Sequence, residues 1–253
     1  MKILVCVKRV PFTGGKMVLA ADSRSLETRH LGFTISPHEE CGVEEAVRII
    51  EASGGESVVV TLGPPEAVEQ LRDAMALGID RAIHLQTDGD EWDGEATADA
   101  ITAAIRAEEA SGQFDLIFFG NESADACGFQ VGLRVAYALG RPCVTGLKGV
   151  KLEGSSVRCE QDTGAGRDVY VVPLPAVVTV KEGLNLPRYP SVPGRMRAAR
   201  KPVSMQTPAR PEQSLNLEEL SVPGGPGRQT KLLGHGGAAA PAVVEMLRDI
   251  GVA

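Results

Sequence analysis

Segments with a strand pattern and segments with a helix pattern alternate over the first 145 of the 253 residues, and this alternation constrains the fold more than any other feature. Short apolar runs predict strands at 2–7, 57–62, 82–85 and 114–119, and indicate another at 141–145. Apolar residues at helical spacing predict helices between them, at 36–52, 67–77, 97–109 and 129–139. This order is typical of an α/β fold, in which helices cover both faces of a parallel sheet. The carboxyl ends of the strands then meet at one edge, where the ligand crevice of such a sheet forms.

The first predicted helix carries a clear start signal. Ser36 can cap it, Pro37 suits its first turn, and Glu39 stands three residues after the cap. Glu44 and Glu45 lie in the middle of this helix. We expect them on an exposed face rather than at an acid–base site.

The pattern changes after residue 146. Segments 147–152, 156–161 and 168–172 resemble hairpin strands, and 175–180 resembles one more buried strand. Residues 202–229 are rich in Pro, Gly and polar groups, which is typical of an extended arm. A short helix at 238–250 either docks on another protein or packs back on its own domain. We therefore expect an α/β domain over 1–202 and a C-terminal arm with a helix over 203–253.

Composition argues against several classes of function. The net charge of -7 and the pI of about 5.2 give no electrostatic footprint for nucleic acid, and the aromatic content of 4% is low for base stacking. The five cysteines form no CxxC pair, so we expect reduced thiols in the cytoplasm. The four histidines have no metal-ligand spacing and complete no catalytic triad. We therefore expect no metal and no catalytic residue of the chain's own.

The segment from Gly120 to Gly132, GNESADACGFQVG, follows the apolar strand 114–119 directly. A strand, a small-residue turn and a helix start together place backbone N–H groups around a phosphate. The spacing matches neither a Walker A loop nor GxGxxG. Asp125 either accepts from a ribose hydroxyl or caps the next helix, and Gln130 either contacts a ligand or is solvated. The strand ends at 6–9, 62–64 and 85–87 are expected to meet this loop.

Residues 184–201, LNLPRYPSVPGRMRAARK, reverse the charge of the chain locally. Three prolines precede a basic helix start. Such a cluster favours docking on an acidic partner, and the alternative is a solvated helix face. Its cations are Arg188, Arg195, Arg197, Arg200 and Lys201.

Several linked segments resemble one family. MKILVCVKRV, SPHEECGVEEAVRI, VVVTLGPPEAVEQLRDAMALGIDRAIHL, the Gly120 loop and PLPAVVTVKEGLNLPRYPSVPGRMRAARKP occur in the order and spacing of the β subunit of electron-transfer flavoprotein. The resemblance is strong over 1–202 and loose over the arm. It implies a Rossmann-like, adenine-nucleotide α-hydrolase-like fold and a heterodimer with an α subunit, on which the arm docks. It also implies a subunit that carries electrons without catalysing a reaction itself.

The resemblance further implies the cofactors and the electron route. The α subunit holds most of the FAD, and the β subunit binds a structural AMP, or a second FAD in electron-bifurcating members. Electrons pass from acyl-CoA dehydrogenases or other flavin dehydrogenases, as in fatty acid oxidation, to a membrane quinone oxidoreductase. Val10-Pro11 resembles the bifurcating branch, whereas the longer segment 185–189 resembles the ordinary one, which we favour. A nucleotide-binding sensor without a redox role is the other alternative.

The family's nucleotide contacts can be transferred position by position. The implied cofactor-binding residues are Cys6, Ser36, Pro37, His38, Glu39, Leu62, Gly63, Gly120, Asn121, Glu122, Ser123, Ala124, Asp125, Cys127, Gly128, Phe129, Gln130, Val131 and Gly132. Asn121 and Glu122 stand where the family usually has Lys and Gln, and Ala126 and Cys127 also depart from its pattern. These changes make the site more negative, so the alternatives are AMP, FAD or no nucleotide.

The resemblance also implies partner-binding residues. They are Glu160, Tyr189, Val192, Pro193, Arg195, Met196 and Arg197. Glu160 matches an acidic residue that bridges to an Arg of the flavin domain. Val192 stands where the family presents a Leu to its dehydrogenase. His38 occupies the position of an aromatic residue near the flavin of the α subunit.

Overall fold

The structure is a computed structural model, and it describes residues 1–212, 214–222 and 231–252. The chain divides into two compact units, Met1–Glu218 and Glu219–Ala253. Each unit is described by itself.

The first unit is built on a nine-stranded sheet with the order β11-β5-β4-β1-β6-β10-β7-β8-β9. Neighbouring strands run parallel from β11 to β7, and β7, β8 and β9 form an antiparallel meander. A separate two-stranded sheet pairs β2 with β3. The strands are β1 (Lys2–Cys6), β2 (Val10–Pro11), β3 (Phe33–Thr34), β4 (Glu56–Gly63), β5 (Arg81–Gln86), β6 (Leu116–Gly120), β7 (Cys143–Glu153), β8 (Ser156–Asp162), β9 (Arg167–Pro173), β10 (Ala176–Val180) and β11 (Val203–Gln206).

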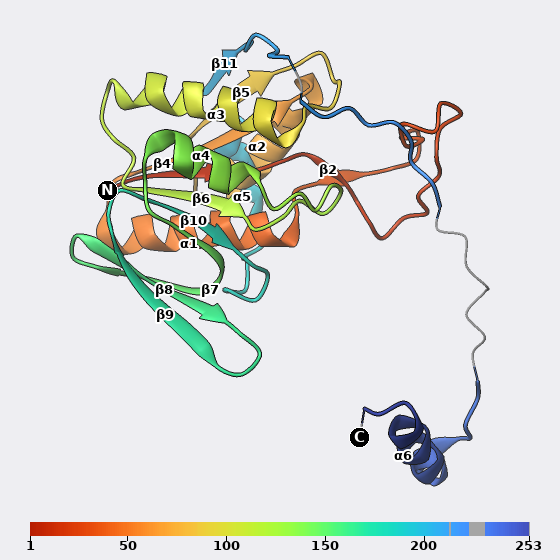
Figure 1. Cartoon of the computed structure of the whole chain (residues 1–253). Helices are drawn as coiled ribbons and strands as arrows, with labels where there is room; N and C mark the ends of the chain where they lie inside the picture. The colour runs from red at the N-terminus through yellow and green to blue at the C-terminus, as the bar shows by residue number, and fades with distance from the viewer. Residues whose placement is uncertain (213, 223–230, 253) are drawn as a thin grey trace. The chain divides into compact units, whose positions relative to one another are not determined.

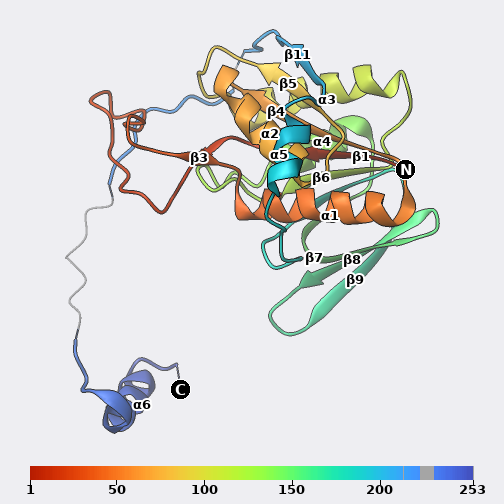
Figure 2. The same ribbon diagram turned by 180° about the vertical axis from the view of Figure 1, so that it is seen from behind.

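Helices cover both faces of the parallel part of the sheet, which confirms the α/β class (Figures 1 and 2). Helices α1, α2 and α5 lie on one face, and α3 and α4 lie on the other (Figures 1 and 2). The helices of the first unit are α1 (Pro37–Ser53), the 3-10 turn η1 (Pro65–Ala67), α2 (Val68–Leu77), α3 (Gly94–Glu109), α4 (Val131–Leu139) and α5 (Val192–Ala198).

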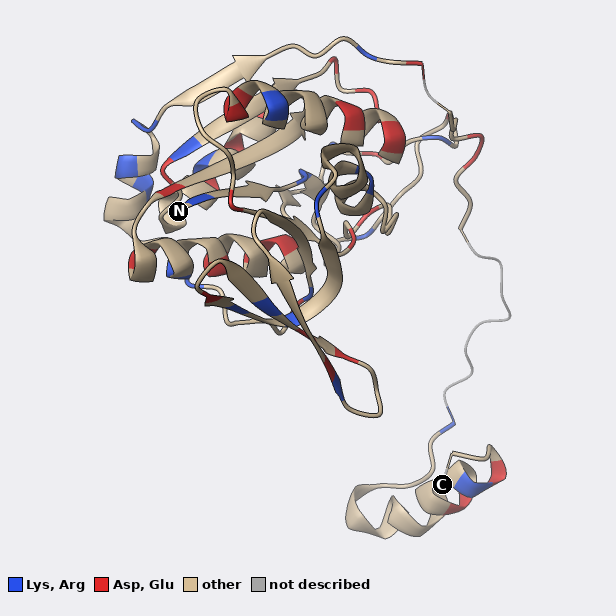
Figure 3. Cartoon of the chain, turned by 60° about the vertical axis from the view of Figure 1, so that its left-hand side comes forward, with Lys and Arg blue, Asp and Glu red and all other residues tan. Residues whose placement is uncertain are grey.

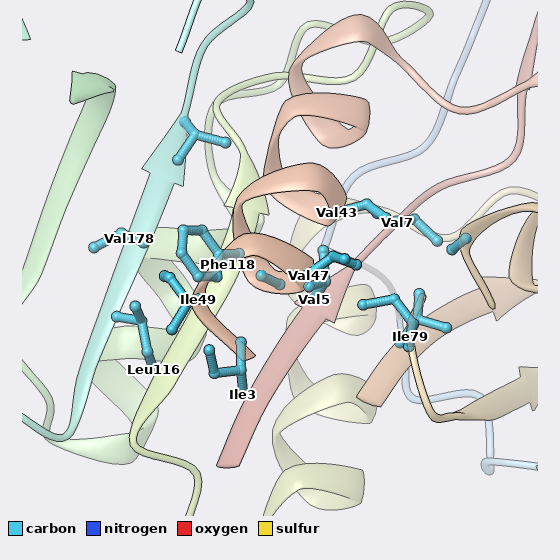
Figure 4. Packing of buried hydrophobic residues seen from close by; sticks show 14 of the residues in the cluster. Ile3, Val5, Val7, Val43, Val47, Ile49, Ile79, Leu116, Phe118 and Val178 are labelled. Carbon is cyan, nitrogen blue, oxygen red and sulfur yellow. The ribbon is translucent and has the colours of Figure 1, made fainter. Parts of the chain in front are cut away.

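Two apolar clusters hold these layers together, one on each face of the sheet. Figure 4 shows the first, in which Val43 and Val47 of α1 lie beside Val5 of β1 and Phe118 of β6. All four are at most 3% exposed. On the other face, Ile101 of α3 and its neighbours pack on the opposite sides of the same strands. Burial on both faces explains why the central strands are continuous apolar runs without alternation.

The four strands and four helices expected before residue 140 are confirmed, with ends shifted by a few residues. The later expectation of separate strands at 141–145 and 147–152 is wrong, because both belong to the single strand β7. This strand pairs parallel with β10 at its start and antiparallel with β8 afterwards. Residues 203–206, expected in the arm, form β11, which pairs with β5 at the edge of the sheet.

Helix α1 begins where the sequence predicts, but the face that carries Glu44 is buried instead of exposed. The Glu39 carboxylate accepts the Ser36 N–H at 3.1 Å, as in a capping box. Glu44, expected on an exposed face, is only 1% exposed. That expectation is wrong because Arg188, from a loop 144 residues away, covers Glu44 and binds its carboxylate at 2.9 Å.

The second unit contains a 3-10 turn η2 (Gly236–Ala239) that leads into α6 (Ala240–Asp249), where the sequence predicts a helix. Residues 223–230 of the expected arm lie outside the described residues. Within the described part of the chain, no helix has the length and hydropathy needed to cross a membrane.

Candidate functional site

A cavity of about 220 Å³ opens above the carboxyl ends of β1, β4 and β6. Strand β1 lies between β4 and β6, so the chain builds the sheet outward in both directions from it. Ligands of open α/β sheets bind at such a switch point. The cavity is lined by the end of β1 with Lys8 and Arg9, by the end of β4, by residues of the segment 87–101, by the Gly120 loop, and by Glu39 and Thr179.

The start of the Gly120 loop is tied to β10. The Asn121 N–H donates to the Val180 carbonyl at 2.9 Å, and the Thr179 hydroxyl donates to the Asn121 side-chain oxygen at 2.8 Å. The same hydroxyl accepts the Gly146 N–H at 3.0 Å. The Asn121 side chain is therefore held by the sheet, and its amide nitrogen donates to the Glu122 carboxylate.

The middle of the loop makes a tight turn. The Ala126 N–H donates to Asp125 at 2.7 Å and to the Ser123 hydroxyl at 3.3 Å. Cys127 and Phe129 have positive φ angles of 47° and 55°, a region that non-glycine residues rarely occupy. The start of the loop is anchored to β10 by Asn121, and backbone strain of this kind is common at ligand sites.

Lys8 joins the two walls of the cavity. Its ammonium lies 2.8 Å from a carboxylate oxygen of Asp125 in the Gly120 loop, and it also binds Glu91 on the opposite wall. Burial acts to lower the pKa of Lys8, but the charges of Glu91 and Asp125 outweigh it and raise that pKa. Burial likewise acts to raise the pKa of Asp125, and the Lys8 ammonium outweighs it, so that the pKa lies below its usual value.

Glu39 lines the cavity and lies against the start of the Gly120 loop. Its carboxylate accepts the Lys8 N–H at 3.0 Å and the Ser36 N–H at 3.1 Å, so it joins the end of β1 to the start of α1. A Cβ atom on Gly120 would come within 2.8 Å of the Glu39 Cγ atom, so only glycine fits there. Burial raises the pKa of Glu39 to about 8 despite these two donors. Burial, and then the charge of Glu39, raises the pKa of the Cys6 thiol, which disfavours a thiolate nucleophile.

Two neighbouring side chains contact the Glu122 carboxylate. Besides the Asn121 amide, His38 Nε2 lies 3.4 Å from the Glu122 carboxylate. His38 Nδ1 accepts the Glu182 N–H at 2.8 Å, which fixes the orientation of the ring. The Asn121 and Glu122 side chains, which depart from the family pattern, thus contact each other.

Most of the predicted cofactor-binding residues meet at this cavity. Those that line it are Cys6, Glu39, Leu62, Gly63, Gly120, Asn121, Glu122, Ser123, Gly128, Phe129, Gln130, Val131 and Gly132. Those outside its lining are Ser36, Pro37, His38, Ala124, Asp125 and Cys127. The Asp125 carboxylate accepts the Ala126 N–H and pairs with Lys8, and it does not cap α4, whose N-cap residue is Gln130. A role in ligand binding stays a prediction for all of these residues.

The predicted partner-binding residues lie away from the cavity. Tyr189, Val192 and Met196 are 95%, 73% and 64% exposed. Arg195 forms an ion pair with Asp73 at 2.9 Å, and Glu160 is held by two arginines of its own hairpin, Arg158 and Arg167. Basic and acidic positions lie close together over this unit (Figure 3).

Not all of the basic segment 184–201 is available to a partner. Arg188 binds Glu44 and Glu51 of α1, and the Lys201 ammonium donates to the Met75, Gly78 and Ile79 carbonyls at the end of α2. These two cations hold the segment on its own domain.

One wall of the cavity, residues 89–94, was not predicted from the sequence, and neither were Thr97, Ile101 and Thr179. Because parallel strands end at one edge of the sheet, the end of β5 at residues 85–87 was expected at the site. The loop that follows this strand is the signal that could have extended the prediction to residues 89–94. This wall contains Trp92, the single tryptophan of the chain, which is 7% exposed. The Trp92 Nε1 and Arg9 Nε atoms are buried without a hydrogen-bond partner in the described part of the chain. Among the described residues, no group of three or more His, Cys, Asp or Glu side chains could hold a metal ion.

The fold and the site define a Rossmann-like α/β protein with a cavity at the switch point of its sheet, the place where ligands of such sheets bind. A family model described as the electron transfer flavoprotein domain matches residues 25–211. The electron transfer flavoprotein subunit beta of Bacillus subtilis (strain 168) is 34% identical over 224 residues, which cover 88% of this chain and 81% of that relative.

Two further relatives agree. The subunit beta of Syntrophomonas wolfei is 35% identical over 226 residues, covering 88% of this chain and 86% of that protein, and the mitochondrial subunit beta of Arabidopsis thaliana is 35% identical over 210 residues, covering 82% of each. The chain therefore belongs to the electron transfer flavoprotein family, among its beta subunits.

Proposed function

We propose that this chain is the β subunit of a heterodimeric electron-transfer flavoprotein and that it binds AMP in the cavity at the Gly120 loop. The observation that carries the proposal is that this cavity, in a chain of this family, is lined by thirteen of the nineteen residues to which the family's nucleotide contacts transfer.

The residues of the cavity fit a nucleotide. The backbone of the Gly120 loop and the start of α4 offer N–H groups to a phosphate, and Lys8 and Arg9 are cationic residues of the cavity lining. Among the described residues, the buried Trp92 Nε1 and Arg9 Nε atoms of its walls have no hydrogen-bond partner, although the Arg9 guanidinium lies over the Phe33 ring. Glu122 opposes a phosphate, but the Asn121 amide donates to its carboxylate, and His38 Nε2 lies 3.4 Å from it. We therefore favour AMP over an empty site.

The flavin would supply the redox chemistry. FAD, held mainly by the α subunit, accepts and releases the electrons, and the β subunit helps to enclose and orient it. The His38 segment, the Glu160 hairpin and residues 219–253 of the C-terminal arm are the parts of this chain assigned to the α subunit. The exposed residues around Val192 receive flavin dehydrogenases such as acyl-CoA dehydrogenase. The electrons leave to a membrane quinone oxidoreductase, and the five unpaired cysteines fit a cytoplasmic carrier.

A reconstitution tests this function. The chain is co-expressed with its α partner, and the complex is isolated by gel filtration. We expect a 1:1 heterodimer with the visible absorbance of a flavin, which an acyl-CoA dehydrogenase and its substrate reduce. A chain that stays monomeric, or a complex without flavin, would contradict the proposal and favour a nucleotide-binding sensor.

A further inference from the structure

A short segment after β11 contacts the outer side of the cavity wall that contains Trp92. We name Arg210, Ser214 and Leu215 the brace. The Arg210 guanidinium donates to the Asp90 carboxylate and to the Glu91 carbonyl, both at 3.0 Å, and lies 6.0 Å from the Trp92 ring. Asp90, Glu91 and Trp92 all line the cavity, so the brace holds this wall from behind.

Asp93 connects the brace to helix α3. One oxygen of its carboxylate accepts the Ala96 N–H at 2.8 Å and so caps the helix. The other oxygen accepts the Ser214 and Leu215 N–H groups at 2.8 and 3.0 Å. The Ser214 hydroxyl also donates to Glu95 at 2.8 Å. A single side chain therefore fixes the start of α3 and the brace together.

The braced wall is in turn tied to the opposite wall. Glu91 binds the Lys8 ammonium, and Lys8 binds Asp125 of the Gly120 loop. A continuous path of contacts runs from the brace, through Glu91 and Lys8, to the loop where a phosphate would lie. Loosening the brace would let the wall at 89–94 move away from Lys8 and open the cavity.

We propose that Asp93 is a positioning residue for nucleotide retention, because it fastens the brace that holds the cavity wall at 89–94 beside Lys8. The brace leads directly into residues 219–253, so attachment of that segment to a partner and retention of the nucleotide support each other. By thermodynamic linkage, a bound nucleotide in turn stabilises the contacts of the brace. This inference rests on the proposed nucleotide site.

The substitution Asp93→Ser separates the two roles of Asp93. Serine is as good an N-cap as aspartate, so α3 keeps its cap, but a hydroxyl cannot also reach the two N–H groups of the brace. The full heterodimer is loaded with labelled AMP, and release is followed after a chase with unlabelled AMP. We expect release at least about 10-fold faster than from the wild type, the size expected for losing hydrogen bonds to a charged acceptor.

The matched control is Asp99→Ser, the same change at an exposed position of the same helix. It should release AMP at the wild-type rate. Hydrogen exchange of peptides over 208–218 should rise in Asp93→Ser alone, while exchange within α3 and the melting temperature stay close to wild type.

The outcomes are distinct. Faster exchange in the brace with an unchanged AMP release rate would overturn the coupling, and unchanged exchange would overturn the role of Asp93. A wild-type complex that neither contains nor binds AMP contradicts the proposed function itself, and this is seen before any variant is made.

Discussion

The Lys8 ammonium lies 2.8 Å from the carboxylate of Asp125, across the mouth of the cavity, and both side chains are less than a third exposed. Substituting Lys8 with Met would leave Asp125 and Glu91 without their shared cation. We expect a loss of about 1–2 kcal/mol in the free energy of unfolding, measured by urea denaturation at pH 7. Lys151→Met, at an exposed pair 4.0 Å apart, is the control and should change little.

The pH dependence of this pair has a definite sign. The pKa of Asp125 lies below its usual value in the folded protein, so its contribution is present at neutral pH and is lost as the pH falls through the folded pKa. The difference between wild type and Lys8→Met should therefore shrink in acid. A difference that is constant from pH 7 to pH 3 would contradict an ion pair at this position.

Arg188 neutralises a carboxylate that is almost completely buried. Glu44 is 1% exposed, and Arg188 makes several hydrogen bonds to it. Arg188→Met should cost about 2–3 kcal/mol in unfolding free energy, less than for a fully buried pair because the Arg188 side chain is 37% exposed. The double substitution with Glu44→Met should recover most of the loss, because no charge then stays buried. Equal losses in the single and double variants would contradict this view.

Glu39 should make the protein less stable in alkali. Burial raises its pKa from 4.5 to about 8 in the folded state, so the folded protein keeps a proton that the unfolded chain loses between these values. Stability from this group is therefore greatest in acid and falls as the pH rises from 4.5 to 8, by at most about 1.4 kcal/mol per pH unit. The difference in unfolding free energy between wild type and Glu39→Gln, measured by urea denaturation at each pH, cancels the contributions of the other titrating groups. A difference that does not depend on pH would show that Glu39 does not hold this proton.

Two glycines of the Gly120 loop should differ in their tolerance of alanine. A Cβ atom on Gly132 would lie 2.9 Å from the Thr179 methyl and 3.1 Å from the Phe119 ring, whereas one on Gly128 would meet nothing within 4 Å. Gly132→Ala should lower the free energy of unfolding by about 1–3 kcal/mol and weaken AMP binding, because Thr179 anchors Asn121. Gly128→Ala should be close to wild type in stability. The reverse order in thermal denaturation would contradict the described packing of the loop.

The order of strands and helices was predictable because it depends on local patterns. Runs such as 57–62 are apolar throughout, and Ser36, Pro37 and Glu39 mark a helix start within four residues. It was also predictable that the strand ends meet at the Gly120 loop, because parallel strands end at one edge of the sheet.

The parts that were not predictable depend on contacts distant in sequence. Glu44 resembles a solvated residue until Arg188, 144 residues away, is placed beside it. Arg210 and Ser214 lie in a stretch with the composition of a linker, and only their contacts with the wall at 89–94 show that they belong to the domain. Strand β7 pairs with β10 at its start and with β8 afterwards. This could not be predicted from its own sequence, because β10 lies later in the chain.

The identity of the nucleotide in the cavity tests the proposed function most directly. The chain is purified with its α partner, the complex is denatured, and the released nucleotides are separated and quantified by chromatography. We expect one AMP and one FAD per heterodimer. Two FAD molecules and no AMP would contradict it in favour of an electron-bifurcating subunit, and FAD alone in a 1:1 ratio would show that the Gly120 loop holds no nucleotide.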